Sequence, residues 1–94
     1  MTVPVFEPFL YRALQQVSRD EIGATSVTGA LRHRTMDLPP RLVSALFMLY
    51  RDGLVTLRDT RAWDGWFSAE LTAPGKWLLG EWERRVIEAQ AQAG

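Results

Sequence analysis

The side chains with the clearest chemical potential in this sequence are its arginines. Six arginines but only three aspartates fall between residues 32 and 61, although the whole chain has 11 basic and 11 acidic residues and no formal net charge. A guanidinium can bind a phosphate or, through two parallel hydrogen bonds, the edge of a guanine base. This segment therefore suits contact with nucleic-acid phosphates, and an ordinary solvated surface is the alternative.

The other polar side chains are not spaced for catalysis or for metal binding. The sequence has no cysteine and a single histidine, His33, so it lacks both a thiolate site and a histidine pair. Its carboxylates are scattered singly, with no Gly-rich phosphate loop and no nucleophile elbow. We therefore expect no enzymatic activity, no metal site and no cofactor, and we expect the His33 ring to be solvated or to face a phosphate.

Length and composition limit the class of protein. A chain of 94 residues with 47% hydrophobic content predicts one domain, residues 1–94, with a single core. No secretory signal follows Met1, and no run approaches the roughly 18 apolar residues of a membrane span. Together with the absence of cysteine, which permits a reducing compartment, these features predict a cytoplasmic protein.

Hydrophobic periodicity predicts the elements that position these side chains. A first amphipathic helix is expected over residues 8–20, with Pro8 in its first turn and Gly23 ending it in a left-handed turn. A second, shorter helix would be capped by Thr25 or Ser26. Its apolar spacing is carried by Val27, Ala30 and Leu31.

A third helix and a hairpin follow the prolines at 39 and 40. The helix is expected over residues 40–52, ended by Gly53. Its inward stripe consists of Leu42, Ala45, Leu46 and Leu49. Two strand-like runs, 54–58 and 66–71, predict an antiparallel hairpin in which Phe67 faces inward and Trp66 outward, and a last helix is expected over residues 74–90.

This order of elements resembles the winged helix-turn-helix. The phrases GLVTLRD at 53–59 and ELTAPGKWLL at 70–79 are similar to the first wing strand and the wing-to-helix junction of bacterial regulators of the MarR and PadR type. The resemblance implies a mainly α fold with a small β-hairpin, consisting of a three-helix core, a wing and a C-terminal helix. It also implies a DNA-binding transcription regulator.

Double-stranded DNA is the partner that the resemblance implies. The helix at 40–52 would lie in the major groove, and the wing at 54–71 would contact the backbone. Side chains expected near the bases are Arg41, Ser44 and Arg51. Side chains expected on phosphates are Arg32, Arg34, Arg58 and Arg61.

A protein-interaction module is the alternative function. The face of the third helix opposite its leucines includes Phe47 and Met48, and an apolar side chain cannot hydrogen-bond a base edge. With Trp63 and Trp66 in the hairpin, these residues would be anchors for a protein partner. Phe47 could instead pack in the core beside Tyr50.

The last helix has more apolar surface than one inward stripe requires. We expect part of this surface to remain exposed in a monomer and to join two copies into a homodimer, which would present two recognition helices to two half-sites. The residues of this interface would be Leu79, Trp82, Val86 and Ile87. In the alternative, the chain is a monomer whose last helix is covered by Phe6, Phe9 and Tyr11.

Overall fold

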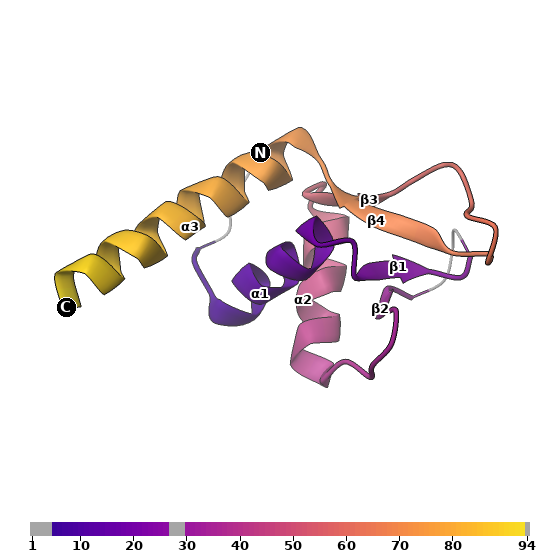
Figure 1. The fold of residues 1–94 in the computed structure, drawn as a ribbon, viewed down its shortest axis with the longest axis horizontal. Coiled ribbons are helices and arrows are strands. Elements are labelled where there is room, and N and C mark those ends of the chain that lie inside the picture. Colours follow the sequence, from indigo (N-terminus) through magenta and orange to yellow (C-terminus); the bar gives the residue numbers. More distant parts are fainter. Residues whose placement is uncertain (1–4, 27–29, 94) are drawn as a thin grey trace.

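The computed structural model describes residues 5–26 and 30–93, which form three helices and a four-stranded antiparallel sheet (Figure 1). The elements follow one another as α1 (Pro8–Ser18), β1 (Ile22–Ala24), β2 (Arg32–His33), α2 (Pro40–Arg51), β3 (Val55–Leu57), β4 (Phe67–Leu71) and α3 (Ala73–Ala93). The strand order in the sheet is β2-β1-β4-β3. The described part of the chain is therefore mixed α/β, with more sheet than the single hairpin that was predicted.

The first helix begins where the sequence predicts and ends slightly earlier. Glu7 caps α1, because its Oε2 accepts a hydrogen bond from the Leu10 backbone N–H at 3.0 Å. After Ser18 the chain turns at Asp20, whose φ is +60°. The prediction that Gly23 ends this helix is wrong, since Gly23 lies in β1.

The prediction of a short second helix is wrong over the residues that the structure describes. Residues 25–26 and 30–31 are not helical, and β1 and β2 flank them as an antiparallel pair; Val27 lies outside the described residues. Residues 22–24 form a strand because they also pair with β4, which lies more than forty residues later in the chain. A strand pair thus stands where a helix-turn-helix would have its middle helix.

Gly23 allows β1 and β4 to approach each other closely. It is paired with Ser68, and a Cβ atom at this position would lie 2.5 Å from Cε2 of Trp66. No side chain fits at that distance, so this close pairing of β1 and β4 requires glycine at position 23.

The predicted helix α2 and the antiparallel pairing of the hairpin after it are confirmed. Leu42, Ala45, Leu46 and Leu49 are all buried, and Gly53 follows α2 with a φ of +77°. The two hairpin strands are antiparallel, with Val55 opposite Leu71. The inward face of α2 therefore packs on α1 and β3, and its opposite face points away from the core.

The last helix belongs to the core only over its N-terminal half. Leu78, Leu79 and Trp82 are buried, whereas residues 87–91 are exposed. Figure 1 shows this C-terminal half of α3 projecting beyond the body formed by α1, α2 and the sheet. Within the described part of the chain, no helix combines the length and apolarity that crossing a membrane requires.

Candidate interaction site

The outer face of α2 carries large apolar side chains that contact water. Phe47 is 63% exposed, Tyr50 42%, and Val43 and Met48 39% each. Val43, Phe47 and Tyr50 follow the spacing i, i+4, i+7, so they form one continuous stripe, which we call the α2 stripe. The alternative in which Phe47 packs in the core is wrong.

This exposure follows from how α2 is held. The buried leucines of α2 face α1 and β3, so a residue on the opposite side of the helix cannot reach the core. Single exposed apolar residues are common on protein surfaces, but a contiguous group on one short helix is typical of an interaction site. The α2 stripe, with Met48 beside it, is therefore the candidate site.

Three of the predicted DNA-contact arginines are paired with carboxylates. Arg58 binds Glu70 across the hairpin at 3.0 Å, and Arg51 binds the adjacent Asp52 at 3.3 Å. Arg34 lies 3.9 Å from Asp20 and 3.9 Å from Asp64, and its guanidinium covers the ring of Trp66 at 4.9 Å from the centroid. These pairs reduce the positive charge available to phosphates.

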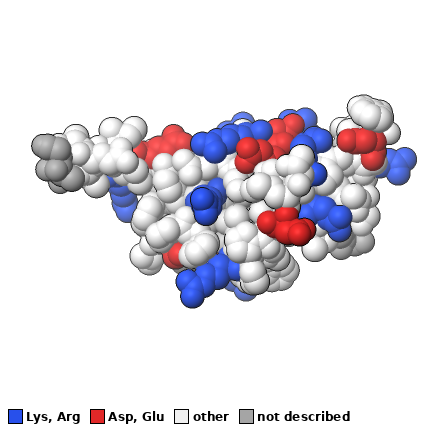
Figure 2. All heavy atoms as spheres, turned by 60° about the horizontal axis from the view of Figure 1, so that its bottom comes forward, with Lys and Arg blue, Asp and Glu red and all other residues white. Residues whose placement is uncertain are grey.

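The other predicted DNA-contact residues are exposed but lie on separate elements. Arg32 lies in β2, Arg41 and Ser44 in α2, and Arg61 in the loop between β3 and β4. Over residues 5–26 and 30–93, none of these three arginines forms an ion pair with a carboxylate. Figure 2 shows basic side chains in separate groups with acidic side chains between them on the face drawn.

The two hairpin tryptophans have opposite environments. Trp63 is 99% exposed in a tight turn, where the Ala62 N–H donates to the Trp66 carbonyl at 2.8 Å and the Gly65 N–H donates to the Ala62 carbonyl at 3.0 Å. Trp66 is only 7% exposed, so its predicted role as an anchor for a partner is wrong.

Trp66 is buried although strand alternation places it on the face away from the core. It shares that face with Ser68, whereas Ala69 packs in the core. Gly23 lets the indole lie against β1, and Arg34 covers the ring. Phe67, which was predicted to face inward, is only half-buried and is not among the residues that pack against the core. Alternation in the sequence therefore cannot show which face of the strand neighbouring elements cover.

The predicted dimer residues are only partly accessible. Leu79 and Trp82 are buried within a single chain, so the expectation that they remain exposed is wrong. The ring of Phe6 packs edge-on against Trp82, with a centroid distance of 5.1 Å, as the monomeric alternative predicts. Val86 is half-buried and Ile87 is exposed.

His33 is more enclosed than expected. Its side chain is 9% exposed, with Nε2 lying 3.6 Å from Oε1 of Glu21. The backbone N–H of Thr35 donates to its Nδ1 at 3.1 Å. The prediction of a solvated or phosphate-facing ring is therefore wrong, and His33 connects β2 to the end of the α1–β1 turn.

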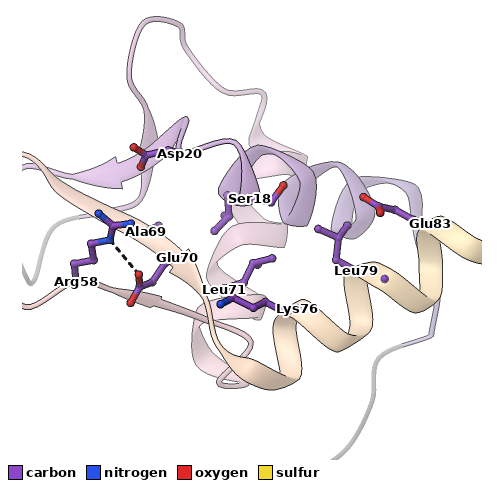
Figure 3. A pocket seen from close by; sticks show the side chains of 11 residues that line it. Ser18, Asp20, Arg58, Ala69, Glu70, Leu71, Lys76, Leu79 and Glu83 are labelled. Carbon is purple, nitrogen blue, oxygen red and sulfur yellow. Dashed lines mark hydrogen bonds and ion pairs between the residues drawn. The ribbon is translucent and has the colours of Figure 1, made fainter.

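A hollow of about 480 Å³ lies between the end of α1, β4 and the start of α3 (Figure 3). Its rim carries two cations, Arg58 and Lys76, and three carboxylates, Asp20, Glu70 and Glu83. Arg58 is already bound to Glu70. Because negative groups outnumber positive groups, this hollow does not suit a phosphate.

Comparison with known proteins identifies no relative. No protein-family model matches the sequence, and searches of curated proteins and of solved structures return no match.

Proposed function

We propose that this chain is a protein-interaction module with a winged-helix-like layout, and that the outer face of α2 is its docking surface. The observation that carries the proposal is the exposure of Val43, Phe47, Met48 and Tyr50 on a helix whose other face is fully buried. The layout is supported by α2 preceding the β3–β4 hairpin and by the pairing of β1 with β4.

The shape of the α2 stripe favours a helix as the partner element. From Val43 to Tyr50 it is a ridge roughly 10 Å long, at 1.5 Å rise per residue. Ridges of this kind pack into the grooves between side chains of a second helix. The partner is therefore a protein that presents an amphipathic helix, with Phe47 as the most exposed anchor.

The same face is poorly suited to reading bases. Specific recognition in the major groove requires hydrogen-bonding side chains on the outer face of the helix, and Phe47 occupies that position here. Three of the seven residues predicted to contact DNA are also held by carboxylates. Both features favour protein binding over sequence-specific DNA binding.

A DNA-binding regulator is the second candidate function. The observation that favours it is that Arg32, Arg41 and Arg61 are exposed and form no ion pair with a carboxylate of the described residues. Three phosphate contacts predict an affinity that falls with a log–log salt slope of roughly −2.7. A gel-shift series with genomic fragments at low salt tests this candidate, and no binding to any duplex would remove it.

Site-specific photo-crosslinking tests the protein-binding function. A benzophenone amino acid replaces Phe47 in one variant and Gln90, on the projecting part of α3, in a matched control. We expect one protein to crosslink at position 47 and not at position 90. Equal yields at both positions, or crosslinks to nucleic acid alone, would contradict the proposal.

The crosslinked protein is then purified for a binding measurement. Phe47→Ser should weaken its affinity by about 30-fold or more, because removal of a hot-spot residue costs about 2 kcal/mol or more. Arg12→Gln on the exposed side of α1 is the control and should leave the affinity unchanged. An unchanged affinity in Phe47→Ser would show that the α2 stripe is not the contact surface.

A further inference from the structure

A second hollow adjoins the docking face, between the N-terminal ends of α1 and α2. Its volume is about 400 Å³. The lining residues are Glu7, Phe9, Leu10, Pro40, Arg41, Ser44, Ala45 and Met48. Leu10 and Ala45 are buried and form its floor, whereas Met48 is accessible at its edge. This volume lies at the lower end of the range of about 300–1,000 Å³ for small-molecule sites, so the hollow has room for one large side chain.

The rim of this hollow carries one carboxylate, Glu7, and one cation, Arg41. Glu7 is already used, because its carboxylate accepts the Leu10 N–H and caps α1. Arg41 is exposed and forms no ion pair over the described ranges, and its guanidinium carbon lies 5.6 Å from the centroid of the Phe9 ring. Ser44, which also lines the hollow, is exposed as well. A carboxylate is therefore the group that the rim can bind.

We infer that this hollow receives an aromatic side chain of the partner helix, and that a neighbouring carboxylate of the partner binds Arg41. The inference rests on the proposed function, because the hollow lies at the N-terminal end of the docking face. It adds the chemistry of the partner's anchor, which the α2 stripe alone does not specify.

The lining favours an aromatic over an aliphatic side chain. An incoming ring can pack edge-to-face or offset against Phe9 and can contact the sulfur of Met48. It can also form a cation–π contact with the guanidinium of Arg41, which already lies over the ring of Phe9. An aliphatic side chain would bury area but make none of these three contacts. A nucleotide fits less well, because the floor is apolar and Arg41 is the single cation among the lining residues.

Peptide titrations followed by NMR test the inference directly. The 15N-labelled chain of 94 residues is titrated with Ac-Gly-Trp-Asp-Gly-NH2 and with two control peptides in which Trp is replaced by Ala or Asp by Lys. We expect the first peptide to shift the amide signals of Phe9, Ala45 and Met48. It should bind about 2- to 5-fold more tightly than the Lys control, which is the range for an exposed ion pair. The Ala control should cause no saturable shift.

A pair of arginine variants shows whether Arg41 supplies the preference. Arg41→Gln should abolish the difference between the Asp and Lys peptides, whereas Arg12→Gln, outside the hollow, should keep it. Equal binding of all three peptides, or shifts outside the hollow, would overturn the inference. If none of the peptides binds in the hollow but position 47 still crosslinks to its partner, the hollow is excluded as the anchor site. The proposal that the outer face of α2 is the docking surface is then retained.

Discussion

The orientation of α2 is the feature on which both proposals depend, and two neighbouring substitutions test it. Leu46 is fully buried and Phe47 is 63% exposed, although they are adjacent in the sequence. Full burial of a phenylalanine side chain contributes about 1.5–3 kcal/mol, so the third of Phe47 that is covered contributes roughly 0.5–1 kcal/mol. Serine and phenylalanine have similar helix propensities. Phe47→Ser should therefore lower the free energy of unfolding by about 1 kcal/mol or less.

Leu46→Ala should be much more disruptive. Removing a fully buried leucine side chain costs about 2–5 kcal/mol, because it loses burial and leaves a cavity. A chain of 94 residues has a total free energy of unfolding of roughly 5–14 kcal/mol, so this loss is a large fraction of the total and should strongly lower the midpoint of unfolding. Urea unfolding followed by circular dichroism measures both variants. Equal losses for Leu46→Ala and Phe47→Ser would mean that α2 is rotated and that its apolar face is not free for a partner.

Three further predictions concern the sheet, the hairpin and α3. Gly23→Ala should lower the free energy of unfolding by about 1–3 kcal/mol, because the added Cβ would clash with the Phe67 carbonyl oxygen and lie 2.5 Å from Cε2 of Trp66. Gly80→Ala, at an exposed position of α3 with open space around it, should raise the free energy of unfolding by roughly 0.8–1 kcal/mol, and thermal unfolding compares the two variants. A double-mutant cycle on Arg58 and Glu70 should give a coupling of about 0.2–1 kcal/mol that decreases in high salt, and a coupling insensitive to salt would contradict an exposed pair. Trp82→Ala should lower the free energy of unfolding by about 3–5 kcal/mol, because the side chain is buried within one chain. If sedimentation shows a change of oligomeric state and stability is not lost, Trp82 lies at a dimer interface instead.

Local patterns in the sequence determined most of the helices and the hairpin. The spacing of apolar residues predicts α1, α2 and α3 with ends that differ from the observed ends by a few residues, and Pro40 and Gly53 mark the start and end of α2. The buried stripe of α2 also follows from its periodicity alone. These features are predictable because their causes lie within one or two turns of the chain.

Only the tertiary structure decided that a strand pair replaces the predicted second helix, and which arginines are paired with carboxylates. β1 is a strand because β4 pairs with it, and Gly23 shows no helical or extended preference of its own that would reveal this pairing. Arg34 is paired with Asp64 and covers Trp66, and the sequence separates both partners from it by about thirty residues. Strand pairing, ion pairs and the covering of a sheet face all join distant segments, and periodicity within a segment carries no information about them. For the same reason the exposure of Phe47, on which the proposed docking surface rests, became decidable only when the packing of α2 was known.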